Sequence, residues 1–99
     1  MATGTFQREM PWFEKQISHN TNYTFSIPSG SGGMVVGMGS QTRVMYLFNA
    51  TSVGAVAYTA IKSDADITVT AGTNTLKVAN ASGGALICYV LALRGEGVS

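Results

Sequence analysis

The chain has 99 residues, of which 45% are hydrophobic and 11% are charged, and its formal net charge is +1. A chain of this length carries the apolar residues of one core, so we expect one globular domain and exclude an intrinsically disordered chain, which pairs low hydrophobicity with high net charge. No run of charged residues is longer than two, which argues against a basic stripe for nucleic acid or a polybasic anchor for an anionic membrane.

The N-terminal stretch is the least regular part of the sequence. Residues 1–9 lack the basic segment and apolar run of a secretory signal, so we expect synthesis in the cytoplasm without export. Pro11 argues against a continuous central strand in this region. We predict that residues 1–20 form either a first strand or an arm that docks on a partner, because large apolar side chains concentrate there: Phe6, Met10, Trp12 and Phe13.

Alternating apolar and polar residues predict β-strands from residue 21 onward, and helical periodicity is close to absent. A first clear strand covers Asn22–Ile27 and stops at Pro28. A glycine-rich, flexible connection over residues 29–33 leads to a strand at Met34–Gly39, whose glycines allow close approach of another backbone. Arg43–Phe48 is β-prone on both faces, so we expect it at the centre of a sheet or beneath a partner.

The second half of the chain contains a long strand, a hairpin and an apolar final strand. Ala55–Lys62 alternates over its whole length, with small residues that permit close packing. Ile67–Thr70 and Leu76–Ala79 flank a turn with Gly, Thr and Asn, which predicts a hairpin. Ala85–Leu93 has no polar face, so we expect it in the middle of a sheet or at a contact between subunits.

Seven to eight short strands separated by Gly, Ser, Asn and Thr turns predict an all-β fold, a small antiparallel β-sandwich or jelly-roll over residues 21–99. The two strands without a polar face carry more apolar surface than one small sandwich covers by itself. We therefore predict a self-association interface that adds to the N-terminal aromatic residues the side chains of Met45, Leu47, Leu86 and Val90.

The titratable residues predict no enzyme and no cofactor. His19 is the only histidine and lies in a polar segment, so a catalytic triad would have one candidate base. Cys88 lies within an apolar run, and we interpret it as a buried apolar side chain. Asp64 and Asp66 offer two oxygen ligands in one loop, which leaves a calcium site open beside an ordinary turn.

Hairpins rich in Thr, Gly, Ala and Asn occupy Ile67–Leu86, and a closing apolar strand ends in Leu91-Ala92-Leu93. In these features the last third of the chain resembles the small β-sandwich modules of bacteriophage virion proteins, especially tail-fibre and receptor-binding heads and head decoration proteins. The resemblance implies a symmetric assembly, commonly a homotrimer, attached to a larger virion protein such as a capsid or tail component. It includes no catalytic or binding motif, so it assigns no site residue.

Two functions follow from the sequence. The first is a non-enzymatic structural subunit of a phage particle (capsid decoration, head fibre or tail fibre), which is made in the host bacterial cytoplasm, associates with itself and docks on a larger virion protein. The alternative is a lectin-like module that binds a cell-surface glycan by stacking Trp12 or Tyr58 on a sugar ring. We expect no nucleic-acid or membrane partner in either case.

Overall fold

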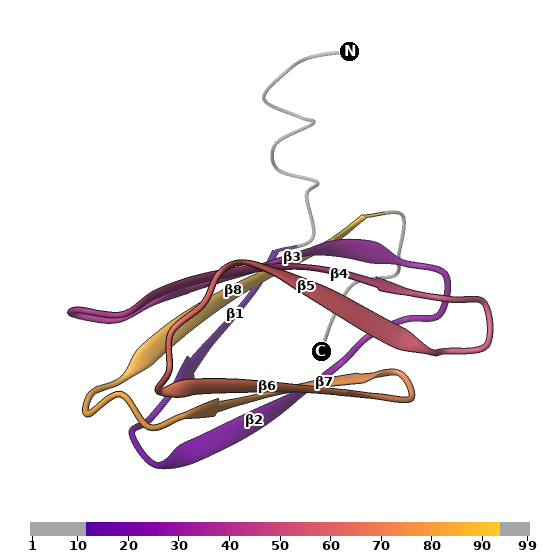
Figure 1. Ribbon diagram of the computed structural model, residues 1–99. Helices are drawn as coiled ribbons and strands as arrows, with labels where there is room; N and C mark the ends of the chain where they lie inside the picture. Colours follow the sequence, from indigo (N-terminus) through magenta and orange to yellow (C-terminus); the bar gives the residue numbers. More distant parts are fainter. Residues whose placement is uncertain (1–11, 94–99) are drawn as a thin grey trace.

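The computed structural model describes residues 12–93, which form eight antiparallel β-strands in two layered sheets (Figure 1). The strands are β1 (Trp12–Ile17), β2 (Thr21–Ser26), β3 (Gly32–Met38), β4 (Arg43–Ala50), β5 (Val56–Lys62), β6 (Ile67–Gly72), β7 (Thr75–Asn80) and β8 (Leu86–Leu93). The larger sheet has the order β1-β8-β3-β4-β5, and the smaller sheet has the order β2-β7-β6. The prediction of an all-β fold of antiparallel strands is confirmed.

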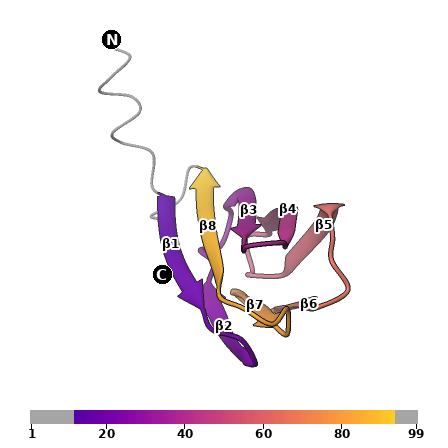
Figure 2. The ribbon, with the colours of Figure 1, turned by 90° about the vertical axis from the view of Figure 1, so that its left-hand side faces the viewer.

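The order of the strands also confirms two sequence predictions about position. β8 lies between β1 and β3, and β4 lies between β3 and β5, so both strands without a polar face are interior strands. β1 and β2 lie beside each other along one side of the molecule, and the connection from β5 to β6 closes the opposite side (Figure 2). The part of the chain described by the structure has no helix with the length and apolarity of a bilayer-crossing segment.

The core lies between the two sheets and takes one face from each strand. Successive side chains of a strand point to opposite faces of the sheet. Every second residue of a strand therefore points into the core, and the residues between them point outward. The larger sheet contributes Ile17, Val35, Val44, Tyr46, Phe48, Leu86, Cys88 and Val90, and the smaller sheet contributes Phe25, Ile67, Leu76 and Val78.

The contact between β3 and β8 depends on a glycine. A Cβ atom at Gly33 would collide with the backbone of Leu91 and Ala92 on β8, so the closest backbone approach lies at a glycine predicted to belong to the flexible connection and not at a glycine of residues 34–39. The flexible connection is shorter than the sequence predicted, because β3 begins at Gly32. Backbone pairing with both neighbouring strands holds these two glycines in the sheet despite their low strand propensity.

The predicted hairpin is formed by β6 and β7. Gly72 pairs with Thr75, so the loop consists of Thr73 and Asn74. Asn74 has a φ of 55°, in the left-handed region that asparagine tolerates better than most residues. Its Nδ2 donates a hydrogen bond of 2.8 Å to the carbonyl of Ile27, which ties the hairpin to the end of β2.

A bulge between β4 and β5 sets the position of Lys62. Met45 pairs with Lys62 while Tyr46 pairs with Ala60, so Ile61 is an extra residue on β5. A bulge of this kind lets one strand carry two residues opposite one on its neighbour. As a result, Lys62 lies beside Met45 on the outside of the larger sheet.

Candidate functional site

The two outer faces of the sandwich differ in chemistry. The outward residues of the smaller sheet are mostly polar: Asn22, Thr24, Ser26, Thr68, Thr70, Thr75 and Lys77, with Gly72 and Ala79 among them. The outward residues of the larger sheet are mostly apolar, and we call this surface the apolar face: Met34, Val36, Met38, Met45, Leu47, Ile87, Tyr89 and Leu91. Antiparallel sheets normally present polar residues to water on the face that is not packed on the core, so the apolar face is the candidate site.

The strand register arranges the apolar face in transverse rows. Residues that pair directly across antiparallel strands lie on the same face of the sheet. One row runs through Leu91, Met34, Leu47 and Thr59, and the next runs through Glu14, Tyr89, Val36, Met45 and Lys62. A third row contains Gln16, Ile87, Met38 and Arg43. Charged residues of these rows therefore stand toward the sides of the face, and its middle is apolar.

The surface of the apolar face has projecting side chains and shallow hollows. Leu47 is 44% exposed and Met38 is 41% exposed, while Ile61 at the bulge is 57% exposed. A hollow of about 290 Å³ lies beside Leu47 and is bordered by Asn49, Ala57, Tyr58 and Thr59. A second hollow of about 180 Å³ is bordered by Val36, Met38, Met45, Arg43 and Lys62. Contiguous exposed apolar surface of this kind marks interaction sites in folded proteins.

The predicted interface residues of the two interior strands lie in different places. Met45 and Leu47 of β4 belong to the apolar face. Leu86 and Val90 of β8 point into the core, and both are 0% exposed, so they are unavailable to a partner in the folded chain. The outward side chains of the same strand are Ile87, Tyr89 and Leu91, which the sequence did not separate from the inward set because both sets are apolar.

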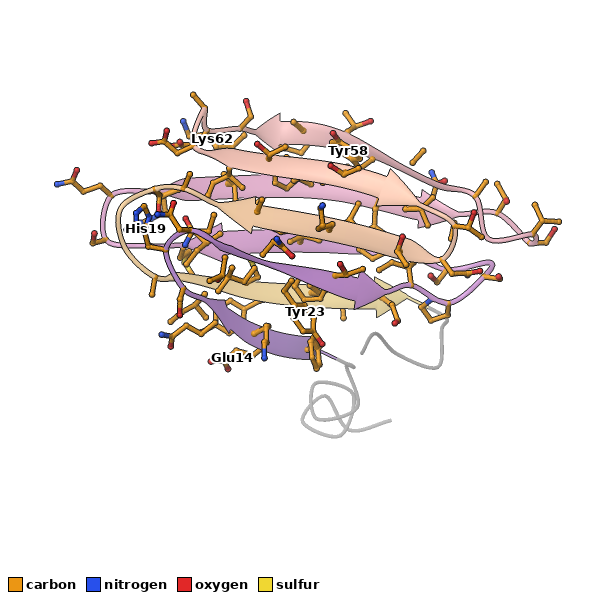
Figure 3. All side chains as sticks on the ribbon, turned by 90° about the horizontal axis from the view of Figure 1, so that it is seen from below. Glu14, His19, Tyr23, Tyr58 and Lys62 are labelled. Atoms are coloured by element: carbon orange, nitrogen blue, oxygen red, sulfur yellow. The ribbon has the colours of Figure 1, made fainter. Side chains whose placement is uncertain are left out.

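Of the predicted N-terminal docking residues, Phe6 and Met10 lie outside the described residues. Trp12 pairs with Leu91 through the backbone as the first residue of β1, and its side chain is not among those described. Phe13 packs against the core, with its ring 6.3 Å from that of Tyr23 and 5.9 Å from that of Phe25. Tyr23, labelled in Figure 3, belongs to β2, and Phe13 belongs to β1, so this aromatic cluster joins the two strands.

The candidate residues for catalysis and metal binding, His19, Asp64 and Asp66, make hydrogen bonds in turns. His19 is exposed in the turn after β1, and its Nδ1 accepts a hydrogen bond of 3.0 Å from the backbone N–H of Gly83. The backbone N–H of Asp66 donates to Oδ1 of Asp64 at 2.9 Å, which is the pattern of an Asx turn. Among residues 12–93, no three His, Cys, Asp or Glu side chains are grouped closely enough to hold a metal ion.

Cys88 and Tyr58 carry two further polar groups on the inner face of the larger sheet. Cys88 is fully buried, and burial raises the pKa of its thiol to about 12, so the neutral thiol is the form present near neutral pH. Tyr58, the candidate for sugar stacking, is 38% exposed. Its hydroxyl donates to the carbonyl of Val69 at 2.9 Å, and its ring meets that of Tyr46 edge-on at 5.9 Å.

Comparison with known proteins places the fold but no family. No protein-family model and no curated protein matches the sequence. The fold is shared with part of the tailspike protein gp49 from the Acinetobacter baumannii bacteriophage Fri1, a capsular polysaccharide depolymerase, with a TM-score of 0.65 and 15% sequence identity. The match covers 89% of this chain and 18% of the tailspike chain, so the chain spans less than a fifth of that protein. The likeness to a phage virion protein is therefore one of fold.

Proposed function

We propose that this chain is a non-enzymatic structural component of a bacteriophage particle, which associates with copies of itself and docks on a larger virion protein. The apolar face carries the proposal. Leu47 and Met38 on this face are 44% and 41% exposed, and covering such side chains contributes about 25 cal/mol for each Å² removed from water. The fold likeness to part of a phage tailspike supports a place in the virion.

The distribution of polar residues supports a domain that is covered on one side. Thr, Ser and Asn occupy the outside of the smaller sheet, where Lys77 provides the charge in the middle row. This face suits contact with solvent, whereas the apolar face suits contact with a subunit. A two-fold pair uses the same patch on both copies, whereas a ring such as the homotrimer expected from the resemblance joins two different patches of each copy.

Two measurements test the proposal. Antibodies against the chain are applied to density-purified particles of the phage that encodes it, with a phage protein known to be absent from particles as the control. Detection in the particles supports a virion role, and detection in the lysate alone overturns it. Light scattering after size exclusion tests self-association, which Leu47→Lys on the apolar face should weaken and the matched change Thr70→Lys on the polar face should leave unchanged.

A carbohydrate-binding module is the second candidate. It is supported by the hollow bordered by Asn49 and Thr59 beside Leu47, and by the activity of the tailspike on a capsular polysaccharide. Calorimetric titration of purified capsular polysaccharides from the host strain, with and without calcium, tests it. Binding that is lost in Asn49→Ala supports the candidate, and the absence of heat at millimolar sugar excludes it.

A further inference from the structure

One transverse row of the larger sheet carries an acid at one end and a base at the other. The register aligns Glu14, Tyr89, Val36, Met45 and Lys62 across all five strands. Figure 3 shows Glu14 and Lys62 at opposite margins of the molecule. Since neighbouring strands are about 4.8 Å apart, the Cα atoms of these two residues are separated by about 19 Å. The two charges therefore do not pair within one chain, and three apolar residues lie between them.

This arrangement distinguishes two ways of packing one apolar face on another. A two-fold axis that runs along the strands above β3 exchanges the ends of the row, so each Glu14 faces Lys62 of the second copy. A two-fold axis that runs along the row leaves its ends in place, so Glu14 faces Glu14 and Lys62 faces Lys62. Like charges in contact are unfavourable, and charge complementarity therefore selects the axis along the strands.

The same axis also matches the apolar side chains. It places the side chain of Leu47, which is 44% exposed, over the position of Leu91 on β8, which is 6% exposed. It stacks Val36 on Val36 and sets Tyr89 against Met45. Sheets that pack face to face keep their strands within about 30° of each other, a condition that both axes satisfy, so the choice between them rests on the charges.

We propose that two copies of this chain pair through the apolar face about a two-fold axis along β3, with Glu14 of each copy opposite Lys62 of the other. This inference rests on the self-association part of the proposed function and names its partner and geometry. Five strands at about 4.8 Å spacing and seven residues at about 3.3 Å give a flat footprint of about 550 Å² per copy, or about 1,100 Å² per pair. Interfaces of about 1,000–1,200 Å² are at the small end of specific contacts, so we expect micromolar affinity.

Charge exchange tests the geometry by analytical ultracentrifugation over a concentration series. The unmodified chain should form a species of twice the 10.3 kDa monomer. Glu14→Lys and Lys62→Glu each place like charges at both margins of the pair, so each should weaken the dimer by about tenfold, and the double exchange should restore it to within about threefold. Lys77→Glu carries the same charge change on the polar face and should leave the affinity unchanged. Circular dichroism confirms that each variant is folded.

A zero-length carbodiimide cross-link supplies an independent readout. In a mixture of isotopically light and heavy chains, a peptide joining Glu14 of one chain to Lys62 of the other supports the proposed pair. A dimer that Leu47→Lys weakens, but in which the double charge exchange fails to restore affinity, overturns the geometry and leaves self-association through this face standing. The inference is overturned if the chain is a monomer at every concentration, or if it forms a trimer that none of these variants weakens. The virion role is tested separately, by detection of the chain in purified particles.

Discussion

The side-chain amide of Asn80 donates a 2.8 Å hydrogen bond to the carbonyl of Ile17, which joins the end of β7 in one sheet to the end of β1 in the other. The same nitrogen donates to the carbonyl of Gly84 at 2.8 Å. Its Oδ1 accepts hydrogen bonds from the backbone N–H and the hydroxyl of Ser82. Asn80 is 1% exposed, so these bonds are shielded from water. One side chain thus holds together the turn after β1 and the turn before β8.

Replacing Asn80 with Ala should lower the free energy of unfolding by about 2–4 kcal/mol, because it leaves the carbonyls of buried Ile17 and half-buried Gly84 without this donor and also opens a cavity. Urea unfolding followed by circular dichroism measures the change. Asn22→Ala removes the same amide from an exposed position on β2 and should change stability by less than about 0.5 kcal/mol. Equal losses in the two variants would contradict the assigned role of Asn80.

The glycine at position 33 gives a second stability prediction. Gly33→Ala should destabilise the fold by more than about 2 kcal/mol, since its Cβ would meet the backbone of Leu91 and Ala92, which has no flexible end to move aside. Gly84→Ala is the matched control, because its Cβ would meet no atom within 4 Å. Thermal unfolding of both variants measures the difference, and a Gly33→Ala melting temperature equal to that of Gly84→Ala would refute the proposed close approach.

Local pattern was sufficient to predict the strands and the interior positions of β4 and β8, because alternation and the lack of a polar face are properties of each segment alone. It was insufficient to orient β8. Leu86 and Val90 are as apolar as Ile87 and Leu91, and the choice between them depends on which sheet lies beneath the strand. The sequence prediction therefore included residues that the fold places in the core.

The candidate site was only partly predictable for a related reason. Met45 and Leu47 were identified because β4 carries apolar residues on both faces, but Met34 and Val36 were not, although they lie in the same rows. The row from Glu14 to Lys62 depends on strand order and on the bulge at Ile61, which are set by pairing between distant segments. Asn80 reads as an ordinary turn residue until its contact with Ile17 is known.

The hydroxyl of Tyr58 links β5 of the larger sheet to β6 of the smaller sheet. Tyr58→Phe removes the hydrogen bond to the carbonyl of Val69 and keeps the ring contact with Tyr46. We expect a loss of about 0.5–1.5 kcal/mol in the free energy of unfolding, which is the usual net value of one such bond. Hydrogen exchange of backbone amides should accelerate in β5 and β6 and stay unchanged in β2. Unaltered exchange in β5 and β6 would show that the bond does not hold these edges together.

Cys88 gives a prediction of chemical reactivity. With its pKa raised from the ordinary value of 9.0 to about 12, the folded chain at about pH 8 holds about a thousandfold less thiolate than an unfolded chain, since each pH unit changes the ratio tenfold. Reaction with a disulfide reagent should therefore be at least that much slower in buffer than in denaturant. Fast labelling of the folded chain would contradict both the burial and the neutral state of the thiol.

The same pKa difference lowers the free energy of unfolding at alkaline pH. The thiol stays protonated in the folded chain above pH 9.0, whereas the unfolded chain ionises there. The contribution is thus fully present below about pH 9 and is lost at up to about 1.4 kcal/mol per pH unit until about pH 12. Cys88→Ala lacks this loss and keeps Tyr46, whose pKa is raised chiefly by burial and least by Cys88, so the difference between the two proteins comes mainly from the thiol. Urea unfolding of both proteins at about pH 7 and about pH 10.5 should show the advantage of cysteine over alanine shrinking by about 2 kcal/mol. A constant difference across this range would mean that the thiol ionises equally in the folded and unfolded chains.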